Sequence, residues 1–426
     1  MIQVGFAGLA FLNSILLARL LGAGGYGAFA NAMAWISLLV IAASFGFGTL
    51  LVRDVAIYRS RREWAAFKGL LRFSDCFALA LSAILSIIVF AVAGCVFPAT
   101  DKEAMRLSLW VAAPLVPLFA LSSLRESAAR GLEHVLRALL PGMILRPGLL
   151  LTGIVAIYLF WPDLLSAPAA MAVNVCTAAI ALVAGEFWLR RLLPSEVKRI
   201  QPKYNCKSWL KAAFLMLIYS GMQTILGQAD IVMLGAMRSP GDVGLYAASS
   251  RLAFLLVYVM MASEIILAPI IARLNGKEEK ERLQKILTRA VRIAFLSVLP
   301  FGLILIFAGG NILLLFGHEF MAAKTALLIL AVGRLADVAA GSGALLLGMT
   351  GYERTVAIIF SGAALENVIL NALLIPKYGI EGAAFALVIS LVGAKLLLSM
   401  FAVKNAGLCV TIFGTLLGGK PVRIGA

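Results

Sequence analysis

The sequence predicts an all-α integral membrane protein with about twelve transmembrane helices in two six-helix lobes that are related by an internal repeat. Three observations support this fold class. Hydrophobic residues make up 62% of the 426 residues and charged residues only 14%, a composition outside the range of ordinary soluble domains. The apolar residues occur in runs of about 20, the length that crosses a bilayer core. Basic residues gather in alternate loops, which is the positive-inside pattern of membrane proteins.

The apolar runs, taken in chain order, predict twelve spans. They cover approximately 2–21, 28–52, 70–97, 105–124, 138–160, 168–189, 212–237, 243–271, 290–316, 322–349, 355–375 and 382–403. The loops after the even-numbered spans up to the eighth are rich in Lys and Arg, whereas the loops after the odd-numbered spans carry few. Because basic loops remain in the cytoplasm, this alternation predicts that both termini are cytoplasmic.

A polar, basic linker over 192–211 separates the first six spans from the last six. The predicted organisation is therefore an N-terminal lobe over 1–191, this cytoplasmic linker, and a C-terminal lobe over 212–426 that ends in a short cytoplasmic tail. A short repeat relates the halves, because Leu17–Ala30 aligns with Leu234–Ala247 and places Gly27 opposite Gly244. Two related halves with ionisable residues inside both are typical of transporters.

Four arginines are candidates for substrate binding, because they lie within or at the ends of predicted spans: Arg19, Arg53, Arg146 and Arg251. An arginine keeps its charge and can direct two N–H donors at one phosphate group. Arginines at different depths of a cavity would therefore suit a diphosphate headgroup. The alternative is that Arg53 is an orientation signal at the membrane interface and that Arg19 extends to the outer headgroups.

Three acidic residues are candidates for ion coupling, since each lies inside a predicted span: Asp230, Glu264 and Glu366. Carboxylates in such positions can exchange protons or bind cations. The alternative is that each one pairs with an arginine of a neighbouring helix and only stabilises its lobe.

Two further charged positions in the second half have simpler interpretations. Arg334 and Asp337 are three residues apart on one predicted helix, which favours an internal ion pair over a transport role. For Lys395 the sequence leaves two possibilities open, namely a pair with Glu366 or a side chain that extends inward.

Several segments, in order along the chain, resemble one membrane family. They are LARLLGAGGYGAFA (17–30), GFGTLLVRDVA (46–56), ADIVMLG (229–235), VGLYAASSRL (243–252), MTGYER (349–354) and NALLIPKYGIEGAAFALVIS (371–390). The chain is similar to the polysaccharide-biosynthesis (Wzx-type O-antigen) flippases of the multidrug/oligosaccharidyl-lipid/polysaccharide exporter superfamily. The resemblance implies twelve to fourteen helices in two MATE-like lobes around a central cavity. It also implies export of a lipid-linked sugar across the bacterial inner membrane, and it supports a substrate role for Arg19, Arg53 and Arg251.

The expected function is therefore the flipping of a polyprenyl-diphosphate-linked oligosaccharide, with the lipid bilayer as surroundings and H+ or Na+ as candidate coupling ions. The alternative is a multidrug or metabolite antiporter of the same architecture, which would need an acidic or apolar cavity for cationic substrates. A membrane enzyme is disfavoured because the predicted outer loops are short, whereas a non-transporting scaffold stays open.

No cofactor, metal or nucleic-acid partner is expected. The net charge of +16 is placed in loops beside the membrane, and the five cysteines and two histidines show no ligand spacing. Gly414–Pro421 is close to a P-loop, but Pro421 stands where Mg²⁺ binding requires Ser or Thr.

Overall fold

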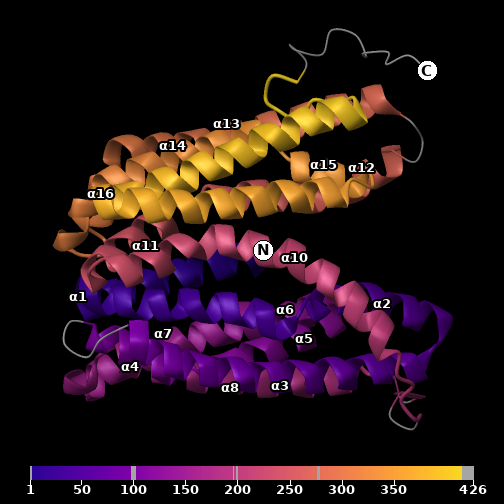
Figure 1. The fold of residues 1–426 in the computed structure, drawn as a ribbon, viewed down its shortest axis with the longest axis horizontal. Helices are drawn as coiled ribbons and strands as arrows, with labels where there is room; N and C mark the ends of the chain where they lie inside the picture. Colours follow the sequence, from indigo (N-terminus) through magenta and orange to yellow (C-terminus); the bar gives the residue numbers. More distant parts are fainter. Residues whose placement is uncertain (1, 97–101, 195, 198–199, 276–278, 415–426) are drawn as a thin grey trace. The chain divides into compact units, whose positions relative to one another are not determined.

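The computed structural model describes the chain except residues 1, 97–101, 195, 198–199, 276–278 and 415–426 (Figure 1). Most of the Gly414–Pro421 stretch therefore lies outside the described residues. By its internal contacts the chain divides into two units, unit 1 over Met1–Gly244 and unit 2 over Leu245–Ala426. The lobe boundary predicted at 192–211 stays a prediction.

Unit 1 is built from helices throughout its described residues. They are α1 (Ile2–Ser44), α2 (Phe47–Arg61), α3 (Trp64–Val96), α4 (Glu103–Ala112), α5 (Leu115–Gly131), α6 (Val135–Leu140), the π turn η1 (Pro141–Leu145), α7 (Arg146–Phe160), the short η2 (Pro162–Leu164), α8 (Ala167–Leu192) and α10 (Cys206–Met237). The helix α11 (Pro240–Phe254) begins in unit 1 and continues into unit 2.

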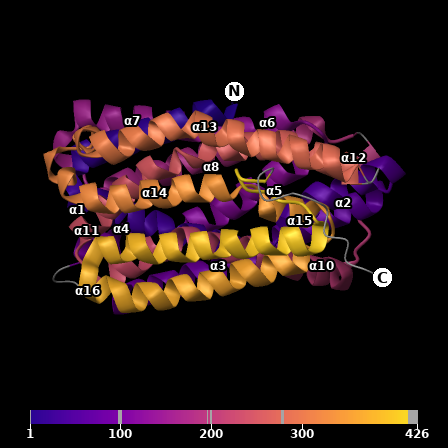
Figure 2. The same ribbon diagram turned by 90° about the horizontal axis from the view of Figure 1, so that it is seen from above.

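Unit 2 is also helical. It contains most of α11, then α12 (Val257–Asn275), α13 (Lys280–Leu313), η3 (His318–Ala323), α14 (Lys324–Ala340), α15 (Gly343–Met349), α16 (Glu353–Phe401) and η4 (Ala402–Ala406). Helices α13, α14 and α16 lie side by side in Figure 2, and α14 contacts both of the others.

Two of the longest helices are each a pair of spans. A glycine with positive φ interrupts α1 at Gly22 (φ 67°) and α16 at Gly379 (φ 58°), a conformation that glycine adopts without steric cost. Figures 1 and 2 show the two halves of α16 running side by side. A helix of 40 residues, such as Gly5–Ser44, is twice the length that a bilayer requires.

With these two helices divided, the predicted number of spans is recovered. Eight described helices are long and apolar enough to cross a membrane, and two bent pairs raise this number to ten. The bent pairs are Glu103–Gly131 and Pro240–Glu264, each with an angle of 44°. Dividing α1 at Gly22 and α16 at Gly379 then gives twelve spans among the described residues. The predicted eighth span, 243–271, is therefore bent between Phe254 and Val257.

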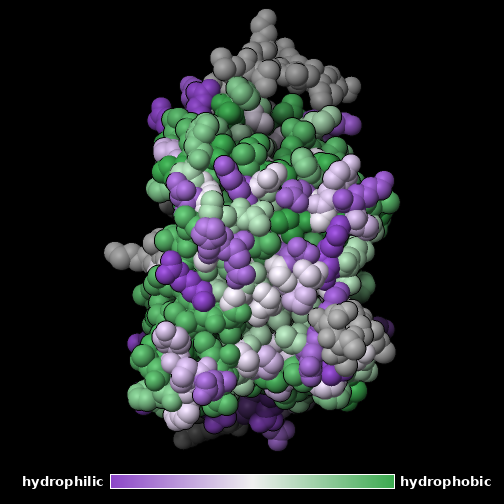
Figure 3. All heavy atoms as spheres, turned by 90° about the vertical axis from the view of Figure 1, so that its left-hand side faces the viewer, coloured by the Kyte–Doolittle hydropathy of each residue, from purple (hydrophilic) through white to green (hydrophobic). Residues whose placement is uncertain are grey.

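Many large apolar side chains are exposed along these helices. On α13 alone, the exposed fractions are 80% for Phe307, 64% for Leu296 and 63% for Phe301. Figure 3 shows apolar residues over much of one face of the molecule. Apolar surface of this extent is unfavourable in water and suits a lipid environment.

The aligned glycines of the internal repeat contact each other, and the residues involved all belong to unit 1. A Cβ on Gly27 would collide with the Pro240 carbonyl oxygen and the Gly244 nitrogen. A Cβ on Gly244 would collide with the Ala23 carbonyl oxygen in the same way. The contact is reciprocal, as expected where a pseudo-two-fold axis relates two similar segments.

Unit 1 also contains an aromatic core where α2, α3 and α10 meet. Phe47 is fully buried and lies edge-on against Phe73 and Phe77, with ring centroids 5.8 and 5.5 Å apart. Trp209 of α10 is 2% exposed and lies against Phe73. This cluster attaches α10 to the first helices of the chain.

In unit 2 the segment that follows η4 is attached to α13. The Gln284 side chain donates a hydrogen bond to the Cys409 carbonyl oxygen (2.6 Å) and accepts one from the Cys409 amide (2.8 Å). Arg292 donates to the Ile412 carbonyl oxygen (2.9 Å), and the Ile412 amide donates to Ala339 (3.1 Å). Val410 is completely buried between these bonds.

Candidate functional site

The four predicted substrate arginines are distributed over both units. Arg19 on α1, Arg53 on α2 and Arg251 on α11 are exposed, and Arg146 at the start of α7 is half-buried. Arg53 forms an ion pair with its neighbour Asp54 (2.7 Å). The first three arginines belong to unit 1 and Arg251 belongs to unit 2. The substrate role of all four stays a prediction.

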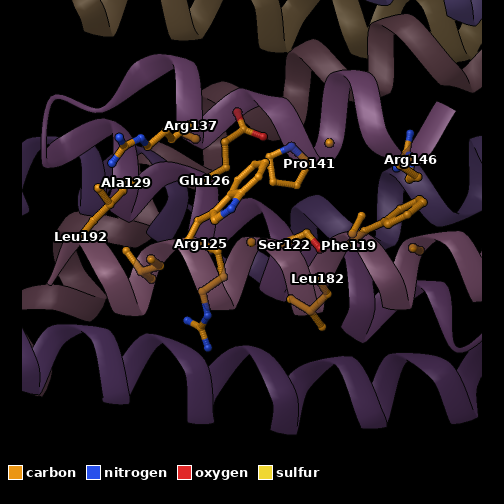
Figure 4. A pocket seen from close by; sticks show the side chains of 17 residues that line it. Phe119, Ser122, Arg125, Glu126, Ala129, Arg137, Pro141, Arg146, Leu182 and Leu192 are labelled. Atoms are coloured by element: carbon orange, nitrogen blue, oxygen red, sulfur yellow. The ribbon is translucent and has the colours of Figure 1, made fainter. Parts of the chain in front are cut away.

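Arg146 lies in a pocket of unit 1 that is formed by α5, by α8 and by the continuous segment from α6 through η1 to α7 (Figure 4). The side chains that matter chemically are Phe119, Arg125, Glu126, Arg137, Arg146 and Trp188. The pocket holds about 520 Å³ of space not filled by atoms, its open mouth included. Only about 40 Å³ of it can hold the centre of a water molecule, so it is narrow.

The π turn η1 determines which side chains of this segment share the pocket. The Arg146 amide donates to the Pro141 carbonyl oxygen, five residues earlier, instead of to the residue four positions back. In a regular α-helix, nine residues would place Arg137 and Arg146 on opposite faces. A π turn takes up one extra residue, which leaves the two about 80° apart. Both arginines therefore line the same pocket.

The charges at the pocket are partly compensated. Arg125 points out of it in Figure 4 and pairs with Asp75 of α3 (2.6 Å) and with Glu186 of α8. Glu126 lies 3.4 Å from Arg130, and Arg146 lies over the ring of Phe119 at 4.4 Å.

Arg137 is different. It is exposed, and its side chain forms no ion pair or hydrogen bond within the part of the chain that the structure describes. It therefore remains available to an anion.

The three predicted coupling acids have different surroundings. Asp230 on α10 is 2% exposed, Glu264 on α12 is half-buried, and Glu366 on α16 is exposed. Beside Glu366, Asn367 is completely buried and accepts a hydrogen bond from Asn371 (3.1 Å). The coupling role of the three acids stays a prediction.

Glu264 belongs to a buried charge cluster in unit 2. Asp337 on α14 pairs with Lys395 of α16 (3.0 Å) and lies 3.7 Å from Arg334. Glu264 faces the Lys395 ammonium and the Ser342 hydroxyl. The predicted pair of Arg334 with Asp337 is confirmed. Of the two possibilities left open for Lys395, the pair with Glu366 is not formed, because α14 places Asp337 at its ammonium.

This cluster lies beside a break in a predicted span. The chain leaves the helix at Gly341 (φ 78°) between α14 and α15. Side chains of α16 satisfy the carbonyl groups that the break releases: Ser399 donates to Ala340 (3.2 Å) and Lys395 approaches the Gly341 oxygen at 3.5 Å. A broken helix beside buried charges is a common construction of ion and substrate sites in transporters.

Sequence reasoning did not identify the Asp75–Arg125–Glu186 network, the place of Arg137 in a pocket, or the part that Lys395 plays. Arg125 and Arg137 follow the fourth predicted span, where the positive-inside pattern gives them only the role of loop charges. The signal that was available is Glu186, an acid inside an apolar run. Among the described residues, no group of three or more His, Cys, Asp or Glu side chains is placed to hold a metal ion.

The family described as polysaccharide biosynthesis protein matches residues 1–275 of the chain, which is well over half of it. The chain belongs to this family. A second family, described as MatE, matches residues 212–373. The family predicted from the ordered segments is thus confirmed.

Among curated relatives, the chain is 27% identical over 166 residues to the "probable low-salt glycan biosynthesis flippase Agl15" of Haloferax volcanii. It is 31% identical over 171 residues to the "probable flippase AglR" of the same organism. Each match covers 38% of this chain and 34% or 35% of the relative. The matched stretch thus spans about a third of the length of these relatives.

Solved structures show the same fold over nearly the whole chain. An inward-facing multidrug resistance MATE family transporter of the MOP superfamily gives a TM-score of 0.78 at 15% identity and covers 94% of both chains. The lipid II flippase MurJ in an inward closed conformation gives 0.73 at 15% identity, covering 95% of this chain and 87% of that one. The predicted MATE-like membrane fold is confirmed, and the chain is a multi-pass membrane protein.

Proposed function

We propose that this protein flips a polyprenyl-diphosphate-linked oligosaccharide across a bacterial inner membrane by alternating access, for surface polysaccharide assembly. Membership of the polysaccharide biosynthesis family supports a glycan as the transported group. The relatives named as probable flippases support flipping of a lipid-linked glycan as the activity. The protein would then act as a transporter without a catalytic step, with both termini in the cytoplasm.

The observation that carries the proposal is an arginine exposed on an apolar helix in each unit, Arg19 on α1 and Arg251 on α11. An arginine that faces hydrocarbon is costly, so such a side chain faces either the interface or a water-filled cavity. In a cavity it would meet an anionic substrate. The diphosphate is the one strongly anionic group common to these lipid-linked glycans, and a guanidinium forms two hydrogen bonds to a phosphate.

The proposal is tested in vesicles that contain the purified protein and a fluorescent polyprenyl-diphosphate oligosaccharide. We expect Arg251→Ala and Arg19→Ala each to slow flipping at least tenfold, because a charged hydrogen bond contributes about 1.5–3 kcal/mol. Arg251→Lys is expected to keep part of the rate, since it retains the charge and loses the paired donors.

The matched control is Arg282→Ala, which removes an exposed arginine at the start of α13 and should leave the rate unchanged. Parent-like flipping by Arg251→Ala and Arg19→Ala together would remove the cavity assignment. The match to the MatE family favours a drug or metabolite antiporter as the second candidate. Export of a cationic dye by the same vesicles, without movement of the glycan lipid, would establish that function instead.

Coupling to an H+ or Na+ gradient is the second part of the proposal, with Asp230, Glu264 and Glu366 as candidate residues. The charge cluster at the helix break favours Glu264, because its carboxylate faces both Lys395 and Ser342. Loss or gain of a proton or cation at Glu264 would change the net charge beside the helix break at Gly341. At this break, side chains of α16 and not helix hydrogen bonds satisfy the backbone carbonyl groups.

Glu264→Gln keeps the shape of the side chain and removes its charge. We expect this variant to flip the glycan lipid at a rate that no longer responds to an imposed pH or Na+ gradient, while its gradient-free rate stays within a few fold of the parent. Flux is measured with and without the gradient. Glu281→Gln, an exposed acid on α13, is the control. An undiminished gradient response in Glu264→Gln would exclude Glu264 from coupling.

A further inference from the structure

We propose that the pocket of unit 1 between α5, η1 and α8 binds the phosphate of a resident anionic phospholipid from the membrane leaflet on the side predicted to be cytoplasmic. This lipid would be a bound component of the protein and would not be transported. The proposal stands whether or not the protein flips a glycan lipid, because it concerns residues of unit 1 alone.

The charge at the mouth of the pocket is the first observation. Arg137 is exposed, lines the pocket, and has no ion pair or hydrogen bond through its side chain within the described ranges. In Figure 4 it lies at one end of the pocket and Arg146 at the other, with Glu126 and Pro141 between them. The negative charge of Glu126 is compensated by Arg130, 3.4 Å away. An anion at the Arg137 end of the pocket therefore meets the available cation of Arg137.

The surroundings of Arg137 are the second observation. The two residues before it on α6 are large, apolar and exposed, at 50% for Val135 and 67% for Leu136. The pocket behind Arg137 is lined by Trp188 and Leu189. An unpaired cation beside exposed apolar surface matches the two parts of a phospholipid. Basic pockets between transmembrane helices on the cytoplasmic side are known to bind such headgroups.

The size of the pocket selects the occupant. A space of about 40 Å³ for the centres of water molecules corresponds to about three to four water positions. A single phosphate group fits this space, whereas a chain of sugars does not. The pocket therefore favours a phospholipid over the headgroup of a glycan lipid. The π turn supports this assignment, because it brings Arg146, which follows the turn, to the same pocket as Arg137.

The test is equilibrium binding of short-chain lipids to the purified full-length protein in detergent, measured by thermal shift and native mass spectrometry. We expect short-chain phosphatidylglycerol to bind at least tenfold more tightly than short-chain phosphatidylcholine. Arg137→Ala should weaken phosphatidylglycerol binding at least tenfold, and Arg137→Lys should restore part of it. Arg61→Ala removes an exposed cation elsewhere in unit 1 and should change binding less than twofold.

A second variant tests the pocket without changing charge. A Cβ on Gly185 would only reach ordinary contact with Pro141 and Arg125, so Gly185→Leu can fold while its side chain fills the pocket. It should abolish the preference for phosphatidylglycerol.

Equal losses of phosphatidylglycerol binding in Arg137→Ala and Arg61→Ala would overturn the proposal, because the binding would then reflect general electrostatic attraction. Competition by a polyprenyl diphosphate at equal or higher affinity would also overturn it, since the pocket would then belong to the transported lipid. Inorganic phosphate should compete only weakly with phosphatidylglycerol, because it lacks the acyl chains that contact the exposed apolar side chains.

Discussion

Asp337→Asn is expected to destabilise the protein by about 3–5 kcal/mol, the usual cost of leaving a buried charge without its partner. The Asp337 side chain is 8% exposed and Lys395 is 14% exposed, with 3.0 Å between their charged atoms. Without the carboxylate, Arg334 and Lys395 both lose their partner, and Glu264 is the remaining acid beside Lys395. The measurement is the thermal unfolding midpoint of the purified protein in detergent.

The double variant Asp337→Asn with Lys395→Met separates loss of a partner from loss of a pair. Removing both charges leaves no uncompensated group, so we expect this variant to recover most of the stability that the single change loses. A single variant as stable as the parent would mean that water reaches the pair and that the cluster is not buried. A double variant less stable than both single variants would mean that the pair itself stabilises unit 2.

Gly27→Ala is expected to be the second most damaging change, although it adds one methyl group. The new Cβ would lie on the Pro240 carbonyl oxygen and the Gly244 nitrogen, so the two segments must separate. Overpacking of this kind costs about 1–3 kcal/mol. It is measured as a lower unfolding midpoint and a lower yield of folded protein.

Gly24→Ala is the matched control, because a Cβ at Gly24 would meet no atom within 4 Å. On the same helix, this change should be neutral or slightly stabilising, since alanine favours a helix by about 1 kcal/mol over glycine. Gly244→Ala should resemble Gly27→Ala. The double variant should cost less than the sum of the two, because both methyl groups disrupt one contact. Equal midpoints for Gly24→Ala and Gly27→Ala would refute the close approach.

The sequence could predict the fold class and the number of spans because both follow from properties that are local in the chain. An apolar run has the same length whatever it packs against, and loop charge is counted without coordinates. The alignment of Gly27 with Gly244 is likewise a local property, because it compares two short segments of the sequence. The spans themselves were placed less well, since Phe254 and Val257 give no local signal that the helix bends between them.

The sites were less predictable, because they depend on which helix faces are brought together. The sequence alone does not determine which acid of the second half pairs with Lys395. The packing of α16 on α14 places Asp337 at its ammonium group. A regular helix would place Arg137 and Arg146 on opposite faces. The π turn that brings them to one pocket has no signal in the residue types of this segment. Glu366 and Asn367 are neighbours in sequence, yet one is exposed and the other completely buried.

The π turn at Pro141–Leu145 also has a consequence for how the family can vary in length. Deleting one residue there would convert the turn into ordinary helix, with Leu140 and everything before it unmoved. Because the turn takes up one extra residue, the residues from Arg146 to Phe160 would keep their orientation relative to Arg137 after the deletion. A gap of one position in an alignment at this point would therefore mark a protein whose fifth span presents the same stripe of side chains to its neighbours without the turn.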